Sequence, residues 1–112
     1  MTSLDRTLAA LADPRRRAVV DTLRRGPKAA GELARDLGVS PSLMSRQLRA
    51  LRESGLVEDS HPAFDTRLRI YSLRAGPMIE LKRWLEETER GWGEQLAAFK
   101  AHVEKPAAEP AP

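Results

Sequence analysis

Apolar residues recur at spacings of three and four over most of the chain, which predicts a protein made mainly of amphipathic helices. The pattern is clearest over residues 31–54, where two such helices follow each other. Their apolar stripes consist of Leu33, Ala34 and Leu37 in the first helix, and of Leu43 or Met44, Leu48 and Leu51 in the second. Because each stripe occupies one side of its helix, we expect the two helices to pack together through these residues.

The segment between the two helices has the residues of a tight turn. Gly38 supplies a position that tolerates positive φ, and Val39 is the apolar residue available to fill the angle between the helices. Ser40 followed by Pro41 predicts a helix start, because a hydroxyl N-cap is joined to a proline at the first helical position. Gly55 predicts a left-handed end to the second helix. Residues 31–54 therefore form a predicted helix-turn-helix.

The outer side of the second helix has a chemistry that suits a DNA groove. Its hydroxyl, amide and guanidinium groups come from Ser42, Ser45, Arg46, Gln47, Arg49 and Arg52, with no acidic residue between positions 41 and 52. Arginine bonds guanine bidentately, glutamine does so with adenine, and serine reaches phosphates or base edges. We predict that this helix binds DNA from its first residues, Ser40 and Pro41, onward. The alternative is a surface helical hairpin whose basic side is merely solvated.

Two segments rich in branched and aromatic residues follow this helix. Residues 56–61 and 68–73 are predicted strands, and the connection 62–67 contains proline and aspartate, which favour turns. A hairpin directly after such a helix is a wing. Arg67 and Arg69 would then lie at its tip and on its returning strand, where they could meet phosphates or a minor groove.

Two aromatic residues of the predicted wing have roles that the pattern leaves open. Phe64 at the tip either stays exposed or packs back on the body of the protein, and Tyr71 is expected in the core rather than at DNA. A two-stranded hairpin is marginally stable by itself, so the wing must lean on the helices. The fold class is therefore mainly α with a small β-hairpin, in the winged helix-turn-helix arrangement.

The N-terminal residues are predicted to be scaffold. Leu4, Leu8 and Leu11 have helical spacing, and Asp13 followed by Pro14 starts a second helix that runs to about residue 25. Its expected core residues are Ala18, Val19 or Val20, and Leu23. The arginines at 15–17 fit either phosphate contacts or a solvated helix start.

A long C-terminal helix carries a second apolar stripe, from Met78 to Val103, that one small domain cannot bury alone. Such a surface predicts a partner helix, most simply from an identical subunit. The predicted dimer interface consists of Leu4, Leu8 and Leu11 in the first helix, and of Leu81, Trp84, Leu85, Thr88, Trp92, Leu96 and Phe99 in the last. Gly91 and Gly93 are read as a close backbone approach, a kink or a local weak point.

Length and composition fit one DNA-binding domain over residues 1–104, followed by a disordered tail at 105–112. The chain has 112 residues, 31% of them charged, with no cysteine and no apolar run long enough for a membrane span. The first residues lack the apolar core of a signal peptide, so a cytoplasmic protein is expected. Residues 1–74 carry a net charge of +5 and the remainder −2, which concentrates positive charge on the predicted DNA-binding part.

Several segments together resemble a known family. They are residues 11–17, 31–34, 39–40, 45–48 and 51–57. Over about residues 4–100 the chain resembles the ArsR/SmtB family of bacterial winged-helix repressors. The resemblance implies a two-fold dimer through the first and last helices and repression of transcription by occupying a promoter. The family often has Gln-Pro where this chain has Pro41-Ser42, and histidine where it has Gln47, so no operator sequence is carried over.

No cofactor and no catalytic activity are expected. The family resemblance implies a possible cysteine metal site at the segment 28–31, but this chain has no side-chain ligand there. A second family site is matched only by His102 with Glu104, a weak candidate for zinc or nickel. His61 and His102 are far apart in sequence, and the chain has no nucleophile motif or phosphate-binding glycine loop. The alternative function is a helical protein-interaction module or an anti-repressor without DNA binding, and the inducing signal stays unknown.

Overall fold

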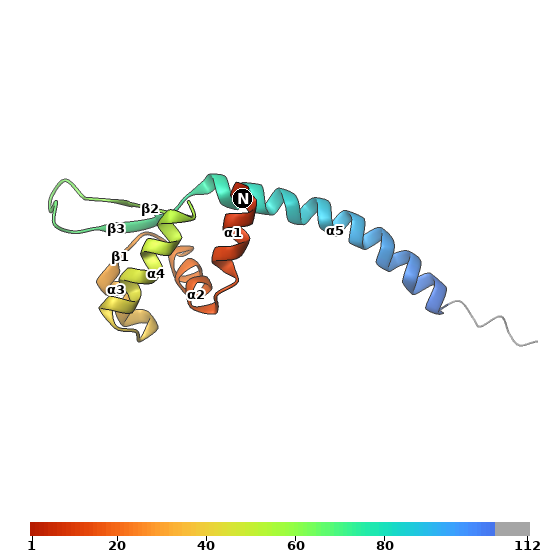
Figure 1. Ribbon diagram of the computed structural model, residues 1–112, viewed down its shortest axis with the longest axis horizontal. Helices are drawn as coiled ribbons and strands as arrows, with labels where there is room; N and C mark the ends of the chain where they lie inside the picture. The colour runs from red at the N-terminus through yellow and green to blue at the C-terminus, as the bar shows by residue number, and fades with distance from the viewer. Residues whose placement is uncertain (105–112) are drawn as a thin grey trace, which may run out of the picture. The chain divides into compact units, whose positions relative to one another are not determined.

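The computed structural model describes residues 1–104, so the tail expected at 105–112 lies outside the described residues. The elements of this part are α1 (Ser3–Leu11), α2 (Pro14–Leu23), β1 (Lys28–Ala29), α3 (Ala30–Leu37), α4 (Pro41–Glu53), β2 (Val57–Ser60), β3 (Ile70–Leu73) and α5 (Ala75–Glu104) (Figure 1). The chain forms two compact units, Met1–Glu80 and the remainder from Leu81 onward, which are described separately below.

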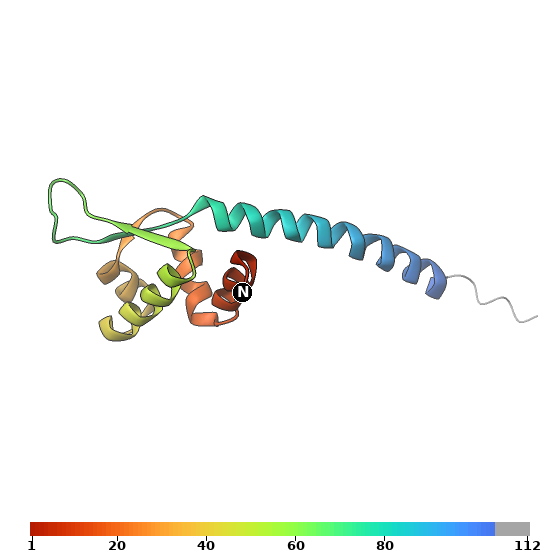
Figure 2. The same cartoon turned by 45° about the horizontal axis from the view of Figure 1, so that its top comes forward.

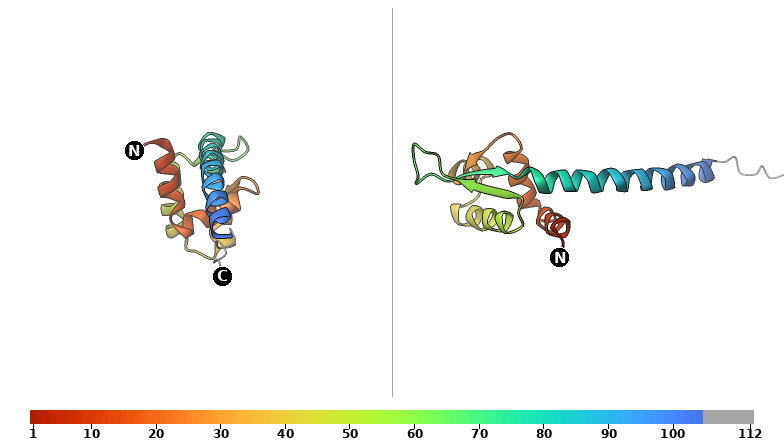
Figure 3. Two further views of the ribbon diagram at one scale, coloured as in Figure 1. Left: turned by 90° about the vertical axis from the view of Figure 1, so that its right-hand side faces the viewer. Right: turned by 90° about the horizontal axis from the view of Figure 1, so that it is seen from above.

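The three strands form one antiparallel sheet in the order β1-β3-β2 (Figure 3). In the register of the hairpin, Val57 lies opposite Leu73 and Ser60 opposite Ile70. The predicted hairpin is therefore confirmed, although its strands are shorter than expected. Strand β1 was not predicted, because two residues are too few to show an alternating pattern, and its partners on β3 lie some forty positions away along the chain.

The helix boundaries follow the capping residues. The Asp13 carboxylate accepts a hydrogen bond of 2.8 Å from the Arg15 backbone N–H, and the Ser40 hydroxyl accepts one of 3.1 Å from the Leu43 N–H. Gly38 ends α3 with φ of 65°, which only glycine adopts without strain. These three predicted helix boundaries are confirmed.

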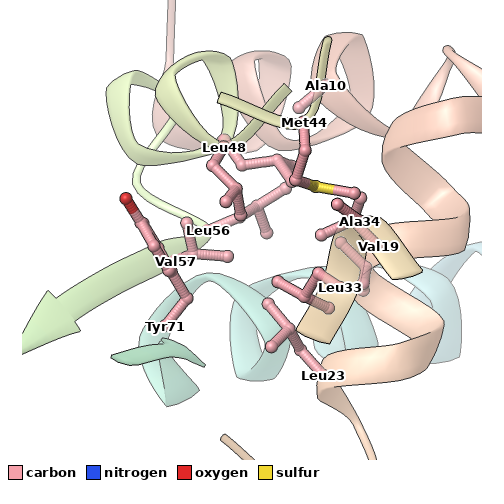
Figure 4. Packing of buried hydrophobic residues seen from close by; sticks show 12 residues of the cluster. Ala10, Val19, Leu23, Leu33, Ala34, Met44, Leu48, Leu56, Val57 and Tyr71 are labelled. Atoms are coloured by element: carbon pink, nitrogen blue, oxygen red, sulfur yellow. The ribbon is translucent and has the colours of Figure 1, made fainter. Parts of the chain in front are cut away.

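The core of the first unit lies between the helices α2, α3 and α4 and one side of the sheet (Figure 4). Its least exposed large side chains are Leu33, Met44, Leu48, Leu51, Leu56 and Val19. Met44 rather than Leu43 occupies the buried position on α4, and Val19 and Val20 are both buried. Tyr71 is buried as expected. Strand β2 thus packs against α4 and strand β3 against α2, which attaches the wing to the helical body.

Helix α1 packs against the core with residues other than the three leucines assigned to the dimer interface. The residues that it buries are Thr7 and Ala10, whereas Leu8 is exposed and Leu4 and Leu11 are only partly buried. Thr7 is tolerated in the core because its hydroxyl donates a hydrogen bond of 3.1 Å to the Ser3 carbonyl. Part of the apolar surface of α1 therefore remains uncovered within one chain.

The wing projects beyond the paired strands as a loop over residues 61–69 (Figure 2). Backbone hydrogen bonds from Asp65 N to Pro62 O at 3.1 Å and from Leu68 N to Asp65 O at 3.2 Å shape its tip. Phe64 is 85% exposed and does not pack back on the body, which excludes one of the two roles left open for it.

The second unit is the part of α5 from Leu81 onward. Its large apolar side chains are mostly exposed, between 39% for Trp84 and 64% for Phe99, while Leu81 is buried. The helix continues through Gly91 and Gly93, and a methyl group at either position would meet no other atom within 4 Å. Within residues 1–104 no other segment therefore approaches the backbone closely at either glycine. No helix in the described part of the chain is both long and apolar enough to cross a membrane.

Candidate nucleic-acid interface

Helix α4 presents the polar surface that the sequence predicts. Met44, Leu48 and Leu51 bind the helix to the core with at most 1% exposure, so the opposite side must face outward. The exposed residues on this helix include Pro41, Ser42, Ser45, Arg46, Arg49 and Arg52, and Ser40 just before it is exposed as well. The rigid core thus holds a row of hydroxyl and guanidinium groups along one helix.

Arg46 and Arg49 differ in what surrounds them. The Arg49 Nε lies 3.2 Å from a Glu53 carboxylate oxygen one turn later, and both side chains are highly exposed. Such a surface pair contributes little to stability and is readily exchanged for another partner. Arg46 has no ion pair among residues 1–104, so its guanidinium is available to a ligand without losing an existing contact.

Gln47 does not lie on the outer surface with its predicted neighbours. It follows Leu43 by four positions and Met44 by three, which turns it toward the apolar side of the helix. The residue is partly buried, lines an apolar cavity of about 270 Å³ beside Val39 and Leu43, and its Oε1 is buried without a hydrogen-bond partner in the described residues. The expectation that it faces away from the apolar stripe is therefore wrong, while its base contact stays a prediction.

Acidic side chains lie close to the arginines of α4, although the sequence of α4 from 41 to 52 contains none. Asp59 on β2 lies 3.4 Å from Arg52 Nε and accepts a hydrogen bond of 3.0 Å from Arg69 Nε. Glu53 lies just beyond the acid-free run and pairs with Arg49. Strand pairing brings Asp59 to these arginines, which the linear sequence does not reveal.

The remaining wing arginine has a different position. Arg67 lies on the loop, is almost fully exposed, and is 3.5 Å from an Asp65 oxygen. Arg69 instead joins Arg52 and Arg49 around a cleft between α4 and β3. The structure therefore separates the two wing arginines that the sequence treated alike, placing one at the tip and the other against the helix.

Among the arginines at 15–17, Arg16 has a structural role. Its Nε donates a hydrogen bond of 2.7 Å to the Ala10 carbonyl and its Nη1 lies 3.4 Å from Asp13, so it closes the end of α1. Arg15 and Arg17 are exposed. Only these two remain open to the predicted phosphate contacts.

Both histidines are exposed. His102 and Glu104 are exposed in the last turn of α5, and His61 Nδ1 lies 3.0 Å from the Leu68 carbonyl on the wing. Among residues 1–104 no three histidine or acidic side chains gather in a way that would hold a metal ion. The weak zinc or nickel candidate stays a prediction.

The sequence of this chain is similar to those of known bacterial transcriptional regulators. Residues 13–59 match the family described as "Bacterial regulatory protein, arsR family". The HTH-type transcriptional regulator Rv2034 of Mycobacterium tuberculosis is 43% identical over 97 residues, which cover 87% of this chain and 85% of that protein.

Solved structures show the same likeness. An ArsR-like transcriptional regulator from Rhodococcus sp. RHA1 is similar at 29% identity and a TM-score of 0.71, over 91% of this chain and 92% of that one. An NMR structure of the homodimeric winged helix-turn-helix domain of Mb0332 from Mycobacterium bovis is similar at 27% identity and a TM-score of 0.59, over 92% and 83% of the two chains.

Proposed function

Since the chain belongs to the bacterial ArsR family and is a transcriptional regulator with a winged-helix DNA-binding domain, we propose that it acts as a homodimeric repressor on a near-palindromic operator. The observation that supports this proposal best is the exposed polar side of α4, where Arg46 has no ion pair among residues 1–104 and Arg69 of the wing lies beside the helix. Bound to a promoter, such a dimer would block the polymerase.

The proposed contacts divide by chemistry. Ser42, Ser45, Arg46 and Gln47 read base edges in the major groove, while Arg49, Arg52, Arg67 and Arg69 bind the phosphate backbone. Ser40 and Pro41 begin the helix at the groove, where the first residues of a recognition helix meet the bases. For Gln47 this requires its partly buried side chain to turn outward on binding, so Arg46 carries most of the proposed specificity.

The dimer is proposed from uncovered apolar surface. The side chains of Trp84, Leu85, Trp92, Leu96 and Phe99 are exposed on α5, and Leu8 is exposed on α1. Surfaces of this kind usually mark an interface. The similar domain of Mb0332 from Mycobacterium bovis is homodimeric. Two-fold symmetry would place two copies of α4 in successive major grooves, about 34 Å apart. The proposed dimer includes Leu4, Leu11 and Thr88 but excludes the buried Leu81 as a main contact.

The experiment begins with selection of bound duplexes from a random library, followed by footprinting and light scattering of the free protein and the complex. We expect an inverted repeat, a protected stretch spanning two major grooves, and two chains per duplex. Transcription in vitro from a promoter containing the selected site should fall as protein is added. A cytoplasmic location in its bacterium follows from this role, and no catalytic step forms part of it.

Two results would contradict the proposal. Failure to enrich any sequence, with the protein folded, would favour the helical interaction module without DNA binding. A monomer by light scattering at tens of micromolar would remove the dimer and with it the reason for a near-palindromic site.

A further inference from the structure

One carboxylate connects α4 to the wing. Asp59 lies opposite Tyr71 in the β2–β3 register, and Arg69 precedes Tyr71 by two residues, so the three side chains belong to one side of the sheet. The two oxygens of Asp59 have separate partners. Oδ2 accepts the hydrogen bond of 3.0 Å from Arg69 Nε, and Oδ1 lies 3.4 Å from Nε of Arg52 in the last turn of α4.

The burial of these three side chains is unequal. Asp59 is 18% exposed, whereas Arg52 is 43% and Arg69 47% exposed. Asp59 therefore lies beneath the two guanidinium groups and is largely shielded by them. Both arginines approach it through Nε. Within residues 1–104 the Arg69 guanidinium donates no other hydrogen bond, and that of Arg52 forms only the ion pair. Their terminal Nη groups remain as donors toward solvent.

The cleft above these groups has a charge that fits an anion. Its volume is about 570 Å³. The residues that line it are Ser45, Arg49, Arg52, Glu53, Arg69 and Tyr71. Three arginines against Glu53 and the underlying Asp59 leave a net charge of +1. Guanidinium groups present paired N–H donors that match two oxygens of a phosphate, which makes a phosphate group the best-fitting ligand.

We propose that Asp59 is a positioning residue that holds Arg52 and Arg69 together so that their free Nη groups bind one DNA backbone phosphate. This inference rests on the proposed function and adds to it a residue that the sequence did not select. Without Asp59 the two guanidinium groups would repel each other, and each long side chain would recover its rotamer freedom. A carboxylate near DNA would then strengthen binding, against what its own charge would do.

The test is whether removing the Asp59 carboxylate weakens DNA binding, as the positioning role requires, or strengthens it, as the loss of a negative charge alone would. The variants Asp59→Ala and Asp59→Asn are compared with Glu58→Ala, which removes the same charge from an exposed neighbour on β2 that has no ion pair in the described part of the chain. Binding to a 30-base-pair duplex is measured by fluorescence anisotropy over a range of salt concentrations. If net charge alone mattered, Asp59→Ala and Glu58→Ala would both tighten binding and leave the salt slope unchanged or steeper.

The positioning role predicts a different pattern. Asp59→Ala should bind about tenfold more weakly, with the salt slope reduced by about one per bound chain, because one phosphate contact is lost. Asp59→Asn keeps one hydrogen-bond acceptor, so its affinity for the duplex should lie between those of Asp59→Ala and the wild type. Thermal unfolding checks that each variant is folded. If Asp59→Ala does not fold, Arg52→Ala, Arg69→Ala and their double variant replace it, and a shared phosphate predicts that the two losses do not add.

The contacted phosphate can be located from the DNA side. A set of duplexes is made in which one phosphate at a time is replaced by a neutral methylphosphonate. At one position the replacement should lower the affinity of the wild-type protein but cause no further loss of affinity in Asp59→Ala. Binding by Asp59→Ala as tight as that by Glu58→Ala, or equal effects of every methylphosphonate on both proteins, would overturn the proposal. If the folded wild-type protein binds no duplex, the proposed function fails, and this inference fails with it.

Discussion

The substitution Arg46→Ala tests the orientation of α4 in the groove. Arg46 is exposed and has no ion pair in the part of the chain that the structure describes, so its removal leaves no partner uncompensated. Alanine is also at least as good a helix former as arginine. We therefore expect the free energy of unfolding to change by no more than about 0.5 kcal/mol. Any large loss of DNA binding must then come from the interface.

The size of that loss follows from the contact that we propose. A bidentate arginine–guanine pair contributes about 1–3 kcal/mol of discrimination. In a two-fold dimer both copies are lost, and distant sites contribute independently, which gives about 2–6 kcal/mol or roughly 30- to 20,000-fold in affinity. The loss should be confined to the operator. Affinity for unrelated duplexes should fall only slightly, as expected for one positive charge removed per chain.

The assay is a competition between the selected operator and duplexes that each carry one changed base pair, at constant salt. Wild-type protein should discriminate between base pairs at the position that Arg46 contacts, and Arg46→Ala should lose base discrimination at that position alone. Arg90→Ala removes the same charge from an exposed position on α5 and serves as the control. Because Arg67 is a proposed phosphate contact, Arg67→Ala should instead weaken binding to all sequences and lower the salt slope. Unchanged discrimination by Arg46→Ala would show that α4 is not the base-reading helix.

The remaining predictions concern assembly, stability and metals. Leu85→Glu or Trp92→Glu places a carboxylate in the apolar surface of α5 and should give monomers or unfolded protein by light scattering, so a stable dimer of either variant would exclude this interface. Ser40→Ala removes the 3.1 Å cap bond and should lower the free energy of unfolding in urea by about 1 kcal/mol; no change would show that the cap contributes nothing. Gln47→Leu removes a buried carbonyl oxygen that has no hydrogen-bond partner in the described residues, and it should raise the free energy of unfolding in urea by about 1 kcal/mol, whereas a decrease would indicate a hidden hydrogen bond. Arsenite and cadmium should leave the protein–operator complex intact because the chain has no thiolate, and zinc or nickel should act weakly at most; release at low micromolar metal would contradict this.

The features that could be predicted from the sequence arise within a few consecutive residues. The cap at Ser40 and the left-handed turn at Gly38 involve hydrogen bonds or dihedral angles of near neighbours, and both were predicted correctly. The apolar stripe of α4 depends only on the period of the helix, so the outward position of Arg46 followed from its spacing. The same period places Gln47 at the border of the apolar stripe of α4. Whether its side chain faces the solvent or the core is decided by the packing of its neighbours.

The tertiary structure decided which distant groups meet. Strand β1 exists because the chain returns to place Lys28 opposite Tyr71, and two residues alone have no pattern that predicts this pairing. The sequence assigned the leucines of α1 to a dimer interface and did not select Thr7 and Ala10, which α1 buries, since packing selects shape as well as hydrophobicity. Asp59 looks like an ordinary strand residue in the sequence, yet β2 carries it beneath Arg52 and Arg69. Helix periods and caps are short-range interactions that the order of residues determines directly. Ion pairs between elements depend on where the folded backbone brings their charges, and only the three-dimensional arrangement contains that information.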